Sequence, residues 1–139
     1  MTSWFKEPII MRIEHLAIWV RDLERMRRFY ERYFDGQAGE RYHNPTKRFT
    51  SYFLSFSNGC RLELMHRPDI AERRVDAKQE LIGLAHFAIS VDDEAAVDRL
   101  TDQLREDGYR IIGEPRRTGD GYYESVVLDP EHNRIEITV

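Results

Sequence analysis

Four side chains that could bind a metal ion occupy matching positions of an internal repeat. Residues 15–22 read His-Leu-Ala-Ile-Trp-Val-Arg-Asp and residues 86–93 read His-Phe-Ala-Ile-Ser-Val-Asp-Asp, at an offset of 71. The tetrapeptides Arg-Leu-Glu-Leu at 61–64 and Arg-Ile-Glu-Ile at 134–137 repeat at an offset of 73. Each half of the chain therefore supplies one histidine and one glutamate, His15 with Glu63 and His86 with Glu136.

Strand periodicity predicts where these four side chains point. Alternation in the first segment places His15 on the face opposite Leu16 and Ile18, whose apolar side chains must pack under a helix. Glu63 and Glu136 alternate with apolar neighbours in the same way. All four polar side chains are expected on the face of their sheet that points away from its own helix.

A metal ion gives this arrangement a physical reason. A carboxylate within an apolar strand lowers stability unless it is paired, hydrogen-bonded or bound to a cation. Two imidazoles and two carboxylates suit Zn, Ni, Co, Fe or Mn better than Ca, and open positions on such an ion polarise substrate oxygens. The alternative is that each histidine is a satisfied structural residue and each glutamate pairs with an arginine. Duplication of all four positions favours the metal site.

The repeat also predicts the elements that position these side chains. We expect two βαβββ modules, residues 13–66 and 84–139, joined by a solvated connector at 67–83 and preceded by an N-terminal arm at 1–12. Trp4 and Phe5 make that arm apolar, so it is expected to pack on the domain or on a partner subunit. Taken together, residues 1–139 are predicted to form one α+β domain.

Local signals set the expected element boundaries. In the first module Asp22 caps a helix that runs to Phe34 and stops at Gly36. The strands of this module are expected at 13–20, 37–42, 48–56 and 61–66. In the second module Asp93 caps the helix and Gly108 closes it. The strands there are expected at 84–91, 109–112, 122–128 and 134–139.

Composition narrows the classes of protein that this chain could belong to. The chain has 139 residues, of which 41% are hydrophobic and 33% charged, enough for one packed core. A net charge of -4 argues against a nucleic-acid binder. The longest apolar run, residues 16–20, is too short to span a bilayer, and the first residues lack a signal-peptide layout. The single cysteine, Cys60, excludes an internal disulfide, so a cytoplasmic protein is expected.

These motifs together resemble the vicinal-oxygen-chelate superfamily, which includes glyoxalase I, extradiol dioxygenases, fosfomycin-resistance proteins and bleomycin-binding proteins. The resemblance spans residues 13–139 and rests on the two His-x-Ala-Ile-x-Val segments, the Arg-Phe-Tyr helix, the two Glu-bearing strands and Asp129-Pro130. It implies paired βαβββ modules that form a cupped mixed sheet around a divalent metal. It also implies a small-molecule substrate, and many relatives form homodimers.

The ligand order His, Glu, His, Glu is similar to that of the glyoxalase I branch. The resemblance implies His15, Glu63, His86 and Glu136 as metal ligands in a lactoylglutathione lyase-like enzyme. It further implies Glu136 as the general base that moves a proton between adjacent carbons of a hemithioacetal. Glutathione-using bacterial relatives carry an arginine four residues after the first His and an asparagine four after the first Glu. This chain has Trp19 and Arg67 there instead, which argues against glutathione dependence.

Substrate contacts and two other functions complete the expectations. Trp19 and Arg67, together with Tyr52 and Tyr122, are candidates to line a substrate pocket. An extradiol-type dioxygenase or a thiol transferase could use the same metal cup. A non-catalytic protein that binds a small ligand such as an antibiotic is the third possibility, although such relatives generally lose the metal residues. The four arginines of the first helix, at 25, 27, 28 and 32, alternate with Glu24 and Glu31, which predicts a solvated face.

Overall fold

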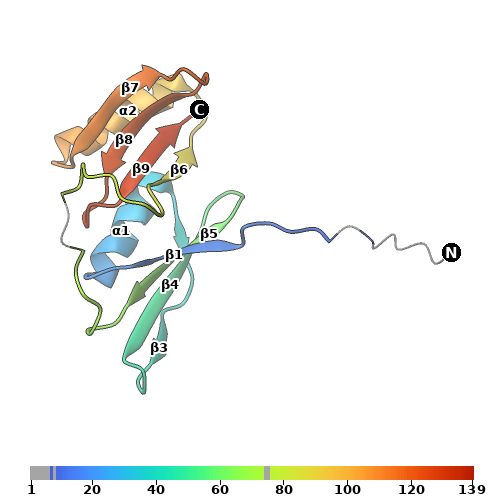
Figure 1. Ribbon diagram of the computed structural model, residues 1–139, viewed down its shortest axis with the longest axis vertical. Helices are drawn as coiled ribbons and strands as arrows, with labels where there is room; N and C mark the ends of the chain where they lie inside the picture. Colours follow the sequence, from blue (N-terminus) through green and yellow to red (C-terminus); the bar gives the residue numbers. More distant parts are fainter. Residues whose placement is uncertain (1–6, 8, 74–75) are drawn as a thin grey trace.

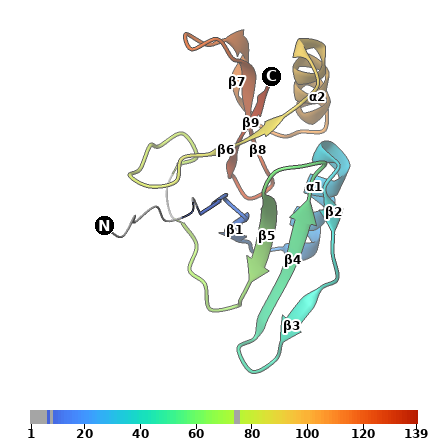
Figure 2. The same ribbon diagram turned by 90° about the vertical axis from the view of Figure 1, so that its right-hand side faces the viewer.

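The chain folds into two modules that each carry their own sheet and helix (Figures 1 and 2). The computed structural model describes residues 7, 9–73 and 76–139. The first module consists of β1 (His15–Trp19), α1 (Leu23–Phe34), β2 (Gln37–Ala38), β3 (Tyr42–Asn44), β4 (Phe49–Ser55) and β5 (Arg61–His66). The second consists of β6 (Phe87–Ser90), α2 (Glu94–Glu106), β7 (Ile111–Arg117), β8 (Tyr123–Leu128) and β9 (Arg134–Thr138).

Both sheets follow one plan. The strand orders are β1-β5-β4-β2, with β3 on β4, and β6-β9-β8-β7. In each sheet the first strand lies at an edge and pairs in parallel with the last strand, while the other pairs are antiparallel. Ala17 lies opposite Glu63, and Ala88 lies opposite Glu136 in the same register. The α+β fold of paired βαβββ modules is confirmed, although the described strands form two separate sheets within the chain.

The helix boundaries follow the capping signals with one correction. The carboxylate of Asp22 accepts from the backbone of Arg25 at 3.0 Å, and that of Asp93 accepts from Ala96 at 2.7 Å. Gly108 takes the left-handed conformation after α2, at φ 91°. After α1, however, Asp35 takes this conformation, at φ 53°, and not Gly36. Asp is tolerated there because a short polar side chain can adopt the left-handed region.

Two expected strands have different limits in the structure. The strand expected at 37–42 is replaced by the short β2 and β3, which both pair with β4. Residues 39–41 between them lie outside both strands, although the backbone N–H of Gly39 still donates to the carbonyl of Phe53 on β4 at 3.0 Å. β7 begins later than expected and continues to Arg117, and its pairing with β8 shifts register at Gly113. Periodicity alone does not reveal such register shifts, because they depend on the partner strand.

Side chains of α1 contribute to the packing of both modules. Its buried face includes Met26, Phe29 and Tyr30. The Phe29 ring lies 5.0 Å from that of Tyr109, and the Tyr30 ring lies 6.2 Å from that of Phe87. One hydrophobic cluster therefore extends from the first sheet through α1 to the second sheet.

Asp129, in the turn between β8 and β9, is a buried acceptor for groups of both modules. It is 2% exposed, and its carboxylate accepts from the Tyr30 hydroxyl at 2.7 Å and from the backbone of Glu131 and Asn133, each at 2.9 Å. The side-chain amide of Asn133 donates a fourth bond, at 2.8 Å. The left-handed residue of this turn is His132, at φ 70°. Asp129 therefore ties α1 of the first module to the last turn of the second.

Replacing Asp129 by Ala is expected to lower the free energy of unfolding by about 3 kcal/mol, because it leaves the buried Tyr30 hydroxyl and the turn amides without an acceptor. Denaturant titration followed by circular dichroism measures the change. Asp102→Ala, on the exposed face of α2, is the matched control and should change the value by less than about 0.5 kcal/mol. Equal effects of the two substitutions would contradict the assigned role of Asp129.

Outside the modules, the described part of the connector is held by contacts with both modules, among them an ion pair between Glu72 and Arg21. The guanidinium of Arg134 on β9 donates to the carbonyls of Ala77 and Gln79. Of the N-terminal arm, Ile9, Ile10 and Met11 are exposed and extend from the body of the molecule (Figure 1). Trp4 and Phe5 lie outside the described residues. None of the helices in the described part of the chain is long and apolar enough to cross a membrane.

Candidate metal centre

His15 and Glu63 form a pair on the open face of the first sheet. The Nε2 atom of His15 lies 3.8 Å from Oε1 of Glu63. The Glu63 side chain is only 14% exposed and alternates on β5 with the buried Leu62 and Leu64, which point to the opposite face. The other ring nitrogen of His15, Nδ1, lies 3.1 Å from Oε2 of Glu14. The contact between the Glu14 carboxylate and Nδ1 orients the imidazole ring, so that Nε2 points toward the carboxylate of Glu63.

His86 and Glu136 form the equivalent pair on the second sheet. His86 directly precedes β6, and its Nε2 atom contacts Oε1 of Glu136. The Glu136 side chain is 17% exposed and lies between the buried Ile135 and Ile137. The two pairs are thus built alike, each from a histidine at an edge strand and a glutamate on the adjacent parallel strand. We call each pair a half-site.

A third carboxyl group, Glu124, lies beside the second half-site. Glu124 on β8 is 8% exposed and is hydrogen-bonded to Glu136, whose carboxyl raises the pKa of Glu124 to about 7. Two carboxyls this close share one proton more readily than they carry two charges. The sequence repeat does not reveal Glu124, since its counterpart in the first sheet is Ser51, which faces Met65 as Glu124 faces Thr138.

Glu124 is expected to make the metal-free protein less stable as the pH rises. Its pKa is about 7 in the folded protein, against about 4.5 for an unperturbed glutamate, so the folded state binds one more proton between these pH values. Stability is then lost as the pH rises through that window. Glu124→Gln should raise the free energy of unfolding at pH 8 by about 1–3 kcal/mol and leave it nearly unchanged at pH 4.5.

Denaturant titrations of chelator-treated protein at the two pH values measure this difference. Glu106→Gln, at the exposed end of α2, is the control and should change the stability little at either pH. A gain for Glu124→Gln that is the same at both pH values would show that Glu124 keeps its ordinary pKa.

The two half-sites do not form one cluster within the chain. Among the described residues, no three His, Cys, Asp or Glu side chains lie close enough together to hold a metal ion. Each half-site nevertheless offers an imidazole nitrogen and a largely buried carboxylate oxygen, which are the donors that Zn and related divalent ions take. The donor set of two half-sites fits such a metal, whereas one half-site offers too few ligands.

Trp19 and Arg67 lie on the open side of the first sheet. Trp19 alternates with the inward Ile18 and is 42% exposed. Its ring packs edge-on against Phe49 at 6.1 Å, and the Arg67 guanidinium lies 5.3 Å above it. Asp69 binds the same guanidinium at 2.8 Å and raises the pKa of Arg67. This part of the face is an aromatic surface next to a neutralised charge.

The two tyrosines expected to line a substrate pocket lie elsewhere. The hydroxyl of Tyr52 donates to Glu24 of α1 at 2.8 Å, so this side chain points to the helix-covered face of the sheet. Tyr52 therefore lies away from the half-site, and Phe53, whose ring packs against His15 at 5.3 Å, faces it instead. Tyr122 is exposed in the turn between β7 and β8, where its backbone pairs with Thr118.

Comparison with known proteins gives a consistent result. The model of the Glyoxalase/Bleomycin resistance protein/Dioxygenase superfamily matches residues 12–137. The uncharacterized protein YqjT of Bacillus subtilis is 25% identical over 132 residues, which are 90% of this chain and 96% of that protein.

Solved structures of glyoxalase I are similar in fold. A mutant of the Zea mays enzyme superposes with a TM-score of 0.74 at 25% identity, covering 91% of this chain. This chain spans only 44% of the length of that maize enzyme. The trypanothione-dependent enzyme of Leishmania major superposes with a TM-score of 0.73 at 25% identity, covering 92% of this chain and 86% of the other. The family match covers nearly the whole chain, and these folds agree with it. The protein belongs to the glyoxalase/bleomycin resistance protein/dioxygenase superfamily.

Proposed function

We propose that the protein is a metal-dependent lyase or isomerase of glyoxalase type. Its substrate would be a small α-oxo compound or the hemithioacetal that such a compound forms with a thiol. The observation that carries this proposal is the pair of equivalent half-sites, each with one histidine and one largely buried glutamate on an open sheet face. Glyoxalase I enzymes of similar fold support the choice of reaction.

Two copies of the chain would complete the centre. A single chain keeps its half-sites apart, and each half-site lacks two ligands of a four-ligand site. β1 and β6 are both edge strands, so the sheet next to each half-site is open to a second chain. In a two-fold dimer, His15 and Glu63 of one copy meet His86 and Glu136 of the other, and symmetry creates two identical centres.

These four side chains would hold a divalent metal such as Zn, Ni, Co, Fe or Mn. When bound, the metal supplies Lewis acidity to two neighbouring substrate oxygens. Glu136 is the base that removes a proton from one substrate carbon and returns it to the next, since it has Glu124 as a neighbour that can carry a proton. His86 contacts Glu136 and orients its carboxyl group.

The surface next to the first half-site favours a thiol other than glutathione. A carboxylate-bearing peptide needs free cationic partners, but Arg67 is already bound to Asp69. Trp19 and Phe49 instead offer ring surface. We therefore expect the substrate to carry an apolar or aromatic group on this side.

Metal analysis and turnover assays test the proposal. Protein purified without chelators should contain a transition metal. It should turn over methylglyoxal mixed with one of a panel of thiols. Removal of the metal should abolish this turnover, and addition of Ni, Co or Zn should restore it. His86→Ala should lose both metal and activity. Absence of metal in the purified protein, with no turnover after reconstitution, would overturn the proposal. Oxygen consumption with a catechol would indicate the dioxygenase alternative, and metal-independent binding of an antibiotic the binding-protein alternative.

A further inference from the structure

We propose a second binding site, for a small anion that carries a planar ring, in the cleft between α1 and Tyr109. The ligand class is the phosphate monoester of an aromatic alcohol. The cleft has a volume of about 510 Å³ and shares no residue with either half-site. This inference is independent of the proposed reaction.

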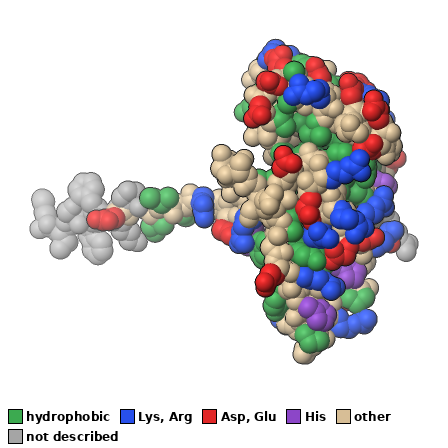
Figure 3. Space-filling view, turned by 180° about the vertical axis from the view of Figure 1, so that it is seen from behind, with side chains coloured by type: hydrophobic (Ala, Val, Ile, Leu, Met, Phe, Trp, Pro, Cys, Tyr) green, Lys and Arg blue, Asp and Glu red, His purple; other side chains and the backbone are tan. Residues whose placement is uncertain are grey.

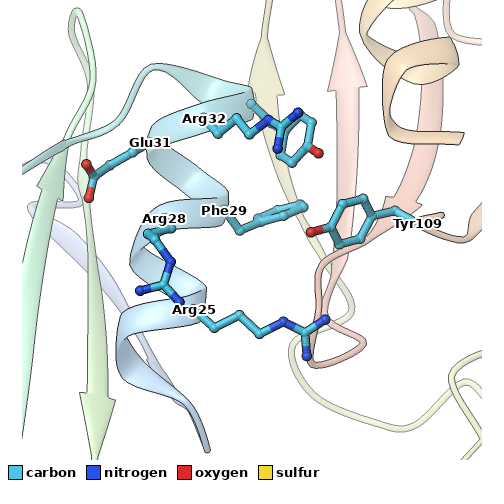
Figure 4. A pocket seen from close by; sticks show the side chains of 7 residues that line it. Arg25, Arg28, Phe29, Glu31, Arg32 and Tyr109 are labelled. Atoms are coloured by element: carbon cyan, nitrogen blue, oxygen red, sulfur yellow. The ribbon is translucent and has the colours of Figure 1, made fainter. Parts of the chain in front are cut away.

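Three aromatic rings form the inner surface of the cleft. Phe29 and Tyr109 point toward each other and are in contact, with Arg32 on one side and Arg25 on the other (Figure 4). The Tyr109 ring lies 5.0 Å from that of Phe29 and 5.4 Å from that of Tyr33.

The charge pattern of α1 is less balanced than its sequence indicates. Arg27 binds both Glu24 and Glu31, and Tyr52 also donates to Glu24. Both acidic residues of the helix are therefore engaged by one arginine, and Figure 4 shows Glu31 pointing away from the aromatic rings. The other three arginines of the helix line the cleft together with Glu31.

These cleft arginines are Arg25, Arg28 and Arg32. Their spacing of three and then four residues places them on one face of the helix. Neither Arg25 nor Arg28 has an ion-pair partner among the described residues, and Arg32 has only Asp107, at 3.4 Å. Asp107 in turn accepts from the hydroxyl of Tyr33 and from Gln103, so its charge is shared. Figure 3 shows basic side chains gathered at mid-height of the molecule, between the modules.

Rings and guanidinium groups together select the ligand. A phosphate dianion can accept bidentate hydrogen bonds from two guanidinium groups at once. A single carboxylate has only two oxygens and one charge, so it engages fewer of these donors. A planar ring attached to that phosphate can stack on Tyr109 and gain contact area at the same time. A cleft of this volume is in the range of small-molecule sites and admits one ring with its phosphate.

Binding of phenyl phosphate to the whole 139-residue chain tests the site. Calorimetric titration at low ionic strength should give saturable binding that weakens as salt is added. The double variant Arg25→Gln, Arg28→Gln should bind at least about tenfold more weakly, the loss expected for charge-assisted bonds. Arg99→Gln, an exposed arginine on α2, is the matched control and should bind as the wild type does.

Two further arms separate the ring from the charge. Tyr109→Leu should lower the affinity for phenyl phosphate to that for inorganic phosphate, while leaving inorganic phosphate unaffected. Amide chemical shifts should change at residues 25–33 and 108–110 when phenyl phosphate is added. Failure of phenyl phosphate to saturate the wild type at millimolar concentration would overturn the proposal, and so would an equal loss of affinity in Arg99→Gln.

Discussion

Replacing Glu136 by Gln is expected to lower turnover by about two to four orders of magnitude, the usual contribution of a general base. The amide keeps the size of the side chain and one oxygen donor, but it accepts no proton from the substrate. Metal should therefore be retained in part while catalysis is lost. Metal content by elemental analysis and kcat on the same preparation separate these two effects.

Two variants serve as comparisons for this result. Glu63→Gln weakens the half-site that does not supply the base, so it should lower metal affinity, and saturating metal should restore much of its turnover. Glu106→Gln, at the exposed end of α2, should change neither. If Glu136→Gln keeps its turnover with metal bound, Glu136 is a ligand alone and another group moves the proton.

Mixing two inactive variants is expected to recover activity if the centre lies between chains. His15→Ala removes a ligand from one half-site, and His86→Ala removes one from the other. In a mixed dimer of these chains, one centre combines both damaged half-sites and the other combines two intact ones. Random pairing then gives about one quarter of the wild-type turnover, because half of the dimers are mixed and each has one intact centre.

The matched control mixes two chains damaged in the same half-site. His15→Ala with Glu63→Ala leaves every centre without one ligand, so no intact centre forms. Co-expression with two different affinity tags ensures that mixed dimers are present in both cases. Activity in the wild type with no recovery in the first mixture would place the centre within one chain, and the sharing of half-sites would be wrong.

Much of the fold was accessible from the sequence because it is duplicated. The repeat of histidine and glutamate at nearly one offset predicts two modules with one register, and Ala17 opposite Glu63 matches Ala88 opposite Glu136. Alternation within single strands predicts which face each side chain takes without knowledge of its partners. The pairing of His15 with Glu63 also requires that β1 and β5 lie side by side, which these local rules do not predict.

Features that depend on a partner strand or helix were not accessible. Tyr52 was expected near the substrate, but the register of β4 places Phe53 opposite Glu63 and turns Tyr52 toward α1. Glu124 has no duplicate in the first module, so the sequence repeat does not indicate it. The face of α1 looked neutral because its charges alternate, whereas Arg27 engages both acidic residues at once.

The placement of α1 also bears on how the protein unfolds. Tyr30 and Phe29 complete the packing of the second module, and Asp129 of that module satisfies the hydroxyl of Tyr30. The first module alone would expose the face of α1 that packs on the second module. The second module alone would expose the apolar surface that α1 covers. The duplicated halves are therefore expected to melt in a single cooperative transition, and neither should fold when expressed alone.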